Sequence, residues 1–310
     1  MKVLISTSSF GQYDSRPLEL LKTRGFEVVL NPYGRTLKAG EVIELAKDCH
    51  GIIAGTEPLT AEVLKNLPLL KAISRVGVGL DNVDIGLAKQ RGITVKSTPH
   101  APTQAVAELT LGLILSVIRK INSMDRGIRS GAWNKEMGGL LSGKTVGIVG
   151  LGRVGRRVAE LLKPFDVKIL ASEPAPDKKW VQKNKVHLTS LEELLGESDI
   201  VTLHIPYTGQ TRNLINAERL NIMKRGAILI NTSRGGLVDE NALYRALKSG
   251  HLGGAALDTF EKEPYTGALT KLENVVLTPH IGSYAVEARV RMETEAVENL
   301  IGALSEGEKR

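Results

Sequence analysis

Three ionisable residues in the C-terminal half of the sequence could carry out proton transfer on a small anion. His280 stands in LTPHIGS, Arg234 in INTSRGG, and Glu263 in ALDTFEKEPY. A histidine exchanges protons near neutral pH, a nearby carboxylate fixes its tautomer and favours its charged form, and a guanidinium grips a carboxylate through two hydrogen bonds. Spacing alone does not show that Glu263 reaches His280. Taken alone, His280 could equally be a structural residue that ends a strand, Glu263 a solvated one, and Arg234 a surface residue of a loop.

A glycine-rich segment predicts a dinucleotide site. VGIVGLGRVG contains Gly150, Gly152 and Gly155 as G-x-G-x-x-G, between an apolar run and an amphipathic stretch. In that context the glycines permit a tight turn, close approach of a pyrophosphate and close packing of a helix whose N-terminus binds the anion. Glu173, eighteen residues past Gly155, is placed to accept hydrogen bonds from ribose hydroxyls. Because a 2′-phosphate would meet this carboxylate as a like charge, we expect NAD rather than NADP, a preference that two nearby lysines temper.

Polar or ionisable residues follow each apolar run of this second half. Because the carboxyl ends of parallel strands meet at one edge of a sheet, where ligands bind, these residues are expected to gather there. His204 is expected to be a cleft-wall or structural residue. The glycine loop and the acid that follows it are expected to hold the cofactor through Gly150, Gly152, Gly155 and Glu173.

The elements that would position these residues form two series. Short β-branched runs alternate with amphipathic stretches from residue 2 to 97, and a second alternation begins at Lys144, which predicts repeated βα units and two parallel sheets. Long helical patterns are expected over residues 103–121 and 284–304. Val286, Val290, Val297 and Ile301 form one stripe of the second pattern. We expect that helix to pack back onto the first series, although a cap on the second sheet is the simpler alternative.

The composition of the chain excludes several classes of protein. The chain has 310 residues, of which 42% are hydrophobic and 24% charged, as in a globular protein of two domains. Its longest apolar run, Leu109 to Ile118, is too short to span a bilayer, and the N-terminus shows no export signal. A single cysteine, Cys49, fits a reducing cytoplasm, and no motif specifies a metal site. The charge of +7 is scattered and aromatic residues are only 4%, so nucleic acid and membrane partners are not expected.

The chain resembles the D-isomer-specific 2-hydroxyacid dehydrogenases, most closely their phosphoglycerate dehydrogenase branch. The resemblance covers nearly the whole chain. It is carried by SRVGVGLDNVD, VAELTLGLIL, GKTVGIVGLGRVG, HIPYTGQTRNLIN, NTSRGGLVDENAL, ALDTFEKEP and LTPHIGS.

The resemblance implies an α/β fold of two doubly wound parallel-sheet domains, with a Rossmann cofactor domain (residues 99–282) inserted in a flavodoxin-like catalytic domain (1–98 and 283–310). It implies that His280 is the acid/base, Glu263 its partner and Arg234 the substrate anchor. It also implies that Asp258 and the Ser283 region hold the nicotinamide end, and that the chain is a homodimer. The further cofactor-binding residues that it implies are Arg153, Val154, His204, Pro206, Thr232, Ser233 and Gly282. The substrate-binding residues implied are Arg75, Val76, Gly77, Val78, Gly79, Arg234 and His280, with amides of the 76–79 loop facing the substrate carboxylate.

Three departures from the family pattern bear on the substrate. The segment IIAGTEPLT lacks the arginine that binds phosphate in phosphoglycerate dehydrogenases, although Arg75 is available, and Tyr284 stands where a small residue is common. The sequence stops without the regulatory domains of longer relatives, so serine feedback is not expected. The leading prediction is oxidation of 3-phosphoglycerate to 3-phosphohydroxypyruvate in serine biosynthesis. The alternatives are a glyoxylate or hydroxypyruvate reductase and, from another class, an NAD(H)-sensing corepressor-like scaffold.

Overall fold

A computed structural model describes residues 1–307 of the chain. The chain divides into two compact units, the first comprising Met1–Pro102 with Ser283–Arg310 and the second Thr103–Gly282. Residues 308–310, at the end of the predicted catalytic domain, lie outside the described residues.

The first unit contains a five-stranded parallel sheet in the order β2-β1-β3-β4-β5. This is the flavodoxin-like order, in which the direction of winding reverses between β1 and β3. All five strands coincide with β-branched runs of the sequence. Their bounds are β1 (Lys2–Ile5), β2 (Glu27–Leu30), β3 (Gly51–Ala54), β4 (Ala72–Arg75) and β5 (Thr94–Ser97).

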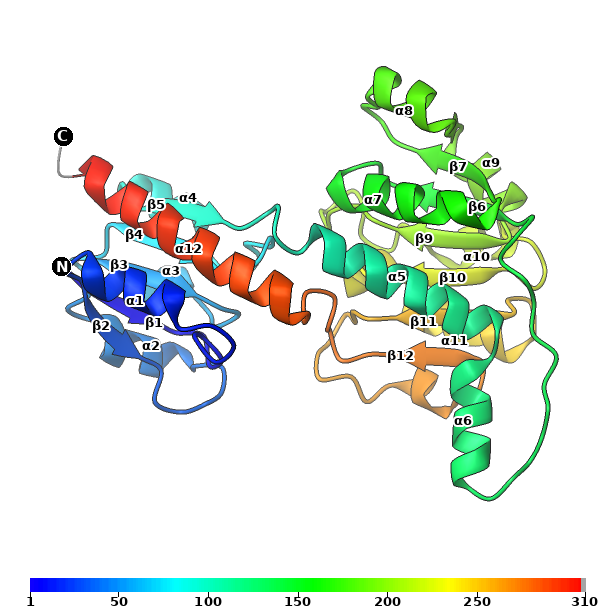
Figure 1. Cartoon of the computed structure of the whole chain (residues 1–310), viewed down its shortest axis with the longest axis horizontal. Helices are drawn as coiled ribbons and strands as arrows, with labels where there is room; N and C mark the ends of the chain where they lie inside the picture. The colour runs from blue at the N-terminus through cyan, green and yellow to red at the C-terminus, as the bar shows by residue number, and fades with distance from the viewer. Residues whose placement is uncertain (308–310) are drawn as a thin grey trace. The chain divides into compact units, whose positions relative to one another are not determined.

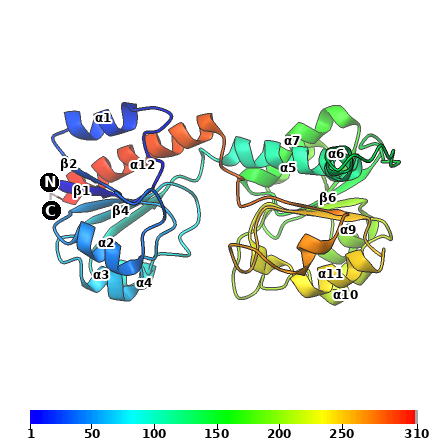
Figure 2. The ribbon, with the colours of Figure 1, turned by 90° about the horizontal axis from the view of Figure 1, so that it is seen from below.

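Helices cover both faces of this first sheet. The helices α1 and α12 lie on one face, and α2, α3 and α4 lie on the other (Figure 2). The bounds are α1 (Arg16–Thr23), α2 (Ala39–Ala46), α3 (Ala61–Lys65), α4 (Ile85–Gln90) and α12 (Val286–Gly307). Each face therefore has its own apolar core, as a doubly wound sheet requires.

The C-terminal helix α12 packs on the first sheet, as expected, but through a different stripe. Met292, Ala296, Leu300 and Leu304 are buried against strand residues such as Val3. Of the predicted stripe only Val297 is buried, so that part of the prediction was wrong. The i, i+4 spacing puts these four residues on one face of the helix, and Gly51 of β3, which has no side chain, leaves room for Leu300 and Leu304.

The second unit contains a seven-stranded parallel sheet in the order β12-β11-β10-β9-β6-β7-β8. The order reverses between β6 and β9, which makes the carboxyl ends of these two strands the switch point at which dinucleotides bind. The bounds are β6 (Thr145–Val149), β7 (Lys168–Ser172), β8 (His187–Leu188), β9 (Ile200–Leu203), β10 (Ile228–Asn231), β11 (Gly254–Leu257) and β12 (Val275–Leu277).

Helices also cover both faces of the second sheet (Figures 1 and 2). On one face lie α5 (Thr103–Ile118), α7 (Arg153–Leu162) and α8 (Lys178–Asn184); on the other lie α9 (Leu191–Glu197), α10 (Ala217–Ile222) and α11 (Glu240–Lys248). The helix α6 (Ile121–Arg129) buries none of its residues and projects away from the sheet beyond β12 (Figure 1). Single turns of 3₁₀ helix occur at Lys163–Phe165, Gly235–Leu237 and Ala268–Lys271. The helix expected over 103–121 is α5, which ends three residues earlier at Ile118. Lys120, with a φ of 54°, separates it from α6, which was not predicted.

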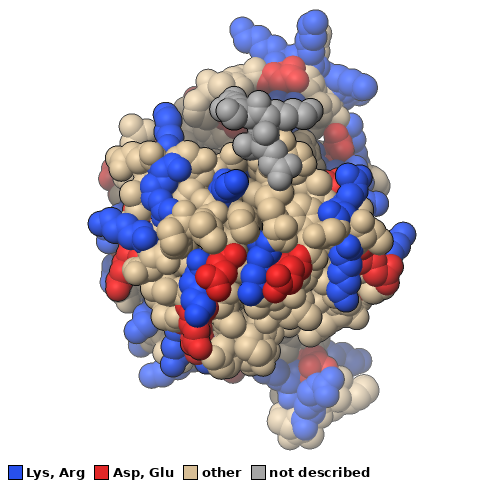
Figure 3. Space-filling view, turned by 90° about the vertical axis from the view of Figure 1, so that its left-hand side faces the viewer, with Lys and Arg blue, Asp and Glu red and all other residues tan. Residues whose placement is uncertain are grey.

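Charged side chains of both signs are interspersed on the face of the first unit that Figure 3 shows. Several form ion pairs with neighbours, such as Lys2 with Glu27 and Arg35 with Glu41. None of the helices within residues 1–307 is long and apolar enough to cross a membrane.

Candidate functional site

The carboxyl edge of the second sheet brings together the predicted chemistry-bearing residues. Across the sheet from β12 to β7 (Figure 1), the strands lead into His280, Asp258, Arg234, His204, Gly150 and Glu173. The prediction of one common edge is therefore confirmed. We define this set of loops as the second-unit edge.

The glycine loop after β6 fits a dinucleotide pyrophosphate. Gly150 has a φ of 96°, and a Cβ on Gly155 would lie 2.0 Å from the Gly150 carbonyl oxygen, so both positions require glycine. A Cβ on Gly152 would meet nothing within 4 Å, which leaves one side of the loop open to a ligand. Gly152 begins α7 and no side chain caps it, so the first-turn N–H groups are available to an anion.

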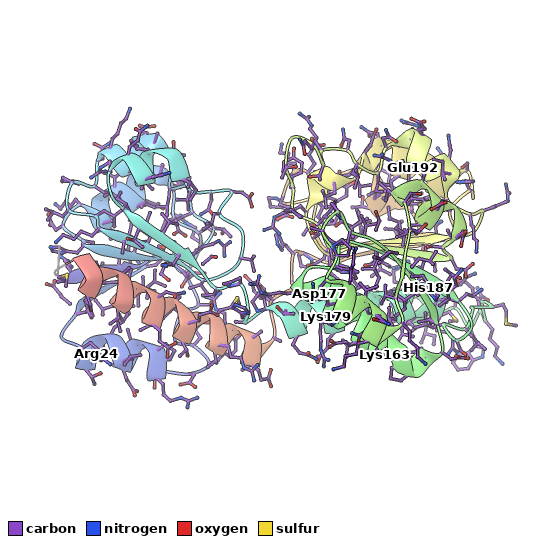
Figure 4. All side chains as sticks on the ribbon, turned by 90° about the horizontal axis from the view of Figure 1, so that it is seen from above. Arg24, Lys163, Asp177, Lys179, His187 and Glu192 are labelled. Carbon is purple, nitrogen blue, oxygen red and sulfur yellow. The ribbon has the colours of Figure 1, made fainter. Side chains whose placement is uncertain are left out.

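The acid after β7 is tied to the glycine loop. The Glu173 carboxylate accepts hydrogen bonds from the amide of Leu151 at 2.8 Å and the amide of Ala175 at 3.1 Å. A carboxylate has about four acceptor positions, so it can also accept from ribose hydroxyls. Asp177 and Lys179 lie at the start of α8 (Figure 4), where Asp177 pairs with Arg156 at 3.2 Å. These positions fit NAD.

His280 and Glu263 are in direct contact, a point that their spacing left open. The His280 Nδ1 lies 2.9 Å and 3.2 Å from the two Glu263 carboxylate oxygens. The amide of Phe260 donates to Glu263 Oε1 at 3.0 Å and holds the carboxylate in place. The contact puts the ring proton of neutral His280 on Nδ1, since Glu263 accepts it there. The Nε2 lone pair on the opposite side of this half-exposed ring is then available for a substrate proton.

Asp258 is fully buried and holds the loop that carries His280. Its carboxylate accepts from the Thr278 hydroxyl at 2.6 Å and from the amides of Ile281 and Gly282 at 2.8 Å. Burial raises the pKa of Asp258 above its usual range, although these hydrogen bonds oppose the change. The loop places His280 at a φ of 55°, a strained conformation for a residue other than glycine. The bonds to Asp258 fix this strained loop.

Arg234 follows β10 in a loop that other strand ends support. The Asn231 side chain donates to the Arg234 carbonyl at 2.9 Å, and the Ser233 hydroxyl donates to the Ile205 carbonyl at 2.6 Å. The Thr232 hydroxyl contacts that of Thr110 in α5 at 2.9 Å. Among the expected cofactor residues, Thr232 and Ser233 thus use their hydroxyls within the protein.

Two supporting residues of this edge were missed from the sequence, Asn231 and Thr278. Each is a short polar residue directly after or at the end of a buried strand. The Asn231 side chain bonds within its own loop, and the Thr278 side chain bonds to Asp258 after the neighbouring strand. Such side chains commonly satisfy backbone groups in turns, and this preference is the signal that could have found them.

His204 is shielded from protonation. Burial lowers the pKa of His204 to about 3. Its Nε2 lies 2.9 Å from the Thr202 hydroxyl. The ring is therefore neutral at physiological pH and fits the expected role of a wall residue. Arg153, Val154 and Pro206 lie on the loops or the first turn of the same edge.

The carboxyl edge of the first sheet presents backbone groups. The Val76 amide donates to the Ala54 carbonyl and the Gly77 amide to the Thr98 hydroxyl, both at 2.8 Å, so the expectation that these two amides face a substrate was wrong. In the described chain, the amides of Val78 and Gly79 donate to no protein acceptor. The Arg75 guanidinium folds back onto the Val76 carbonyl. Ser283 and the exposed Tyr284 belong to this unit.

No group of three or more His, Cys, Asp or Glu side chains within residues 1–307 is placed to hold a metal ion.

Known proteins with similar sequences and structures cover nearly the whole chain. Glyoxylate reductase of Thermofilum pendens is 48% identical over 80% of this chain and 76% of its own. D-3-phosphoglycerate dehydrogenase of Archaeoglobus fulgidus is 37% identical over 97% of this chain and 57% of its own. The crystal structure of the TT0316 protein of Thermus thermophilus superposes with a TM-score of 0.90 at 40% identity, covering 98% of this chain and 97% of its own.

The family model described as "D-isomer specific 2-hydroxyacid dehydrogenase, NAD binding domain" matches residues 111–282, which are most of the second unit. The chain therefore belongs to the D-isomer-specific 2-hydroxyacid dehydrogenases, a family of NAD-dependent oxidoreductases.

Proposed function

We propose that the protein reduces small, unphosphorylated 2-keto acids to D-2-hydroxy acids, with glyoxylate and hydroxypyruvate as the first candidates. The observation that carries the chemistry is the His280–Glu263 contact of 2.9 Å on the same sheet edge as the glycine loop. The second unit then serves as the cofactor domain and the first as the substrate domain.

His280 is the proposed acid/base. When bound, NADH supplies the hydride for C2 of the substrate. His280 Nε2 gives a proton to the C2 oxygen in reduction and takes it back in oxidation. The Glu263 carboxylate, held by the Phe260 amide, stabilises the charged ring and keeps its Nδ1 proton in place. Asp258 positions His280 through the Thr278–Gly282 loop.

Arg234 is the proposed anchor for the substrate. Its planar guanidinium can bind the carboxylate through two hydrogen bonds and polarise the adjacent carbonyl. In the first unit, the amides of Val78 and Gly79 are proposed to bind a carboxylate, because the protein leaves them without acceptors within residues 1–307.

The identity of the substrate rests on the segment after β3. Residues 54–60 contain no lysine or arginine, whereas a phosphorylated substrate needs a cation at its far end. The resemblance to glyoxylate reductases supports the same preference. Oxidation of 3-phosphoglycerate in serine biosynthesis is the second candidate, favoured by Arg75 at the end of β4 and by the resemblance to a phosphoglycerate dehydrogenase over 97% of this chain.

The test is NADH oxidation with glyoxylate, hydroxypyruvate, pyruvate and phosphohydroxypyruvate in parallel. We expect the highest kcat/KM with glyoxylate or hydroxypyruvate. A preference for phosphohydroxypyruvate would restore the second candidate. An absence of turnover with all four would refute the proposal.

We also propose that the protein acts as a cytoplasmic homodimer. Four large apolar side chains in and after α6 are strongly exposed: Ile128, Trp133, Met137 and Leu140, with Met137 at 91% and Trp133 at 79%. Several exposed apolar side chains in one segment favour a protein interface there. Light scattering after gel filtration should give twice the mass of the chain, and a monomer at micromolar concentration would contradict the dimer.

A further inference from the structure

A buried carboxylate lies at the switch point of the first sheet, where the general geometry of doubly wound sheets places a ligand crevice. Ser6 follows β1 and Gly55 follows β3, and these two strands are neighbours with the register Ile5↔Ile53. Glu57 joins their carboxyl ends. Its side chain accepts hydrogen bonds from the Ser6 hydroxyl and, at 3.0 Å, from the Gly55 amide.

The Glu57 carboxylate is buried among neutral hydrogen-bond donors. The residue is 1% exposed, and within residues 1–307 its carboxylate accepts hydrogen bonds from the Ser6 hydroxyl and the Gly55 amide. The Asn82 side chain donates to the Glu57 carbonyl at 2.7 Å and fixes the segment that carries it. A charge held in a partly dry environment acts over several ångströms, because little solvent screens it.

The same edge leaves a polar group ready for a neutral ligand. The Thr7 hydroxyl is buried and has no hydrogen-bond partner within the described residues. A Cβ on Gly55 would lie 3.0 Å from Glu57 Oε2 and 3.1 Å from Thr7 Cγ2, so the space at Gly55 is filled and a longer basic side chain does not fit there.

The free amides indicate where the far end of a substrate would lie. Val78 and Gly79 follow β4, whose neighbours are β3 on one side and β5 on the other. On the β5 side, Thr98 already bonds to Gly77. The loop after β4 packs on the segment that carries Glu57, because the Asn82 side chain donates to the carbonyls of Gly55 at 3.3 Å and Glu57 at 2.7 Å. A molecule whose carboxylate binds the Val78 and Gly79 amides can therefore extend its other end toward Glu57.

We propose that Glu57 is a specificity-determining residue that disfavours 2-keto acids with a phosphate at the far end and favours those with a hydrogen atom or a hydroxymethyl group there. This proposal rests on the proposed function. Glu57 does so by like-charge repulsion of the phosphate dianion, not by contact with the reacting atoms.

The test compares hydroxypyruvate with phosphohydroxypyruvate in wild type, Glu57→Gln and Glu57→Asp. We expect Glu57→Gln to raise the ratio of kcat/KM for the phosphorylated over the unphosphorylated acid by about tenfold or more, mainly through KM, because the repulsion acts on binding. Glu57→Asp keeps the charge and should keep the wild-type ratio. Glu62→Gln, an exposed acid on α3, is the matched control and should also keep it.

A second variant maintains the test if Glu57→Gln does not fold. Thr56 is exposed beside Glu57, so Thr56→Lys adds a compensating charge and should also raise the ratio. The proposal is overturned if both folded variants keep the wild-type ratio, if Glu57→Asp changes it as much as Glu57→Gln, or if wild type prefers the phosphorylated acid. If wild type reduces no keto acid at all, the proposed function fails instead.

Discussion

The carboxyl edges of the two sheets differ in chemistry, although both sheets are parallel and helix-covered. The second-unit edge presents ionisable side chains after successive strands, such as Arg234, Asp258 and His280, held by hydrogen bonds from neighbouring loops. The first edge presents the amides of Val78 and Gly79 beside small polar residues and one buried carboxylate. Proton transfer needs titratable side chains, whereas recognition of a carboxylate needs only fixed N–H groups. We therefore expect substitutions at the second-unit edge to change turnover and cofactor binding. Substitutions at the first edge should change KM.

The largest effect is expected at His280. His280→Asn removes the proton donor while asparagine tolerates the left-handed backbone, so kcat should fall about 10²–10⁴-fold with NADH affinity retained. Steady-state NADH oxidation and a fluorescence titration with NADH measure the two quantities. His187→Asn, on exposed β8 (Figure 4), is the control and should leave both unchanged. Near-normal turnover of His280→Asn would show that His280 is not the proton donor.

Two glycine substitutions separate cofactor binding from folding at the same edge. Gly155→Ala forces its Cβ against the Gly150 carbonyl, so the free energy of unfolding should fall by about 1–3 kcal/mol and NADH should bind more weakly. Gly152→Ala meets no protein atom within 4 Å, so only NADH affinity should fall. Thermal denaturation and NADH titration check both. If Gly152→Ala bound NADH normally, the open side of the loop would not be the pyrophosphate site.

At the first edge, Thr98→Val should act on the substrate and not on the cofactor. The substitution leaves the Gly77 amide buried without its acceptor, which should lower the free energy of unfolding by about 1–3 kcal/mol and loosen the 76–79 loop. KM for the keto acid should rise severalfold while the Kd for NADH is unchanged. Thr94→Val, at the other end of β5, is the matched control. A change in NADH affinity would contradict the proposal that the first edge binds the substrate and not the cofactor.

The smallest effect concerns pH and His204. The pKa of His204 is about 3 in the folded protein and near 6.5 in the unfolded chain, so the unfolded chain binds a proton first as pH falls. The free energy of unfolding should therefore fall as pH drops from about 6.5 toward 3, by less than the full 1.4 kcal/mol per pH unit because the residue keeps some exposure. Denaturation with urea at several pH values should show a shallower decline in His204→Gln. An equal decline would assign the acid sensitivity to other groups.

Local sequence patterns predicted most of the helices and strands, because hydrophobic periodicity and turn residues act between positions that are close in the sequence. Alternating β-branched and amphipathic segments located every strand except the two-residue edge strand β8, and the glycine loop identified the start of the second sheet. The patterns failed where packing between elements decides the result. The buried stripe of α12 follows Met292, Ala296 and Leu300 and not the predicted valines, because the position of the helix on the strands decides which face is buried. Lys120 ends α5 through a left-handed conformation that no residue type there announces.

The sequence by itself determined which residues stand at the strand ends, among them Gly150, Arg234 and His280, because strand ends follow from the hydrophobic pattern. Tertiary structure alone decided which of them meet. Glu263 reaches His280 across seventeen residues, Asp258 bonds the loop of the next strand, and Glu57 joins β1 to β3. These contacts depend on the order of strands in each sheet, which brings distant loops within hydrogen-bond distance and which spacing along the chain does not encode.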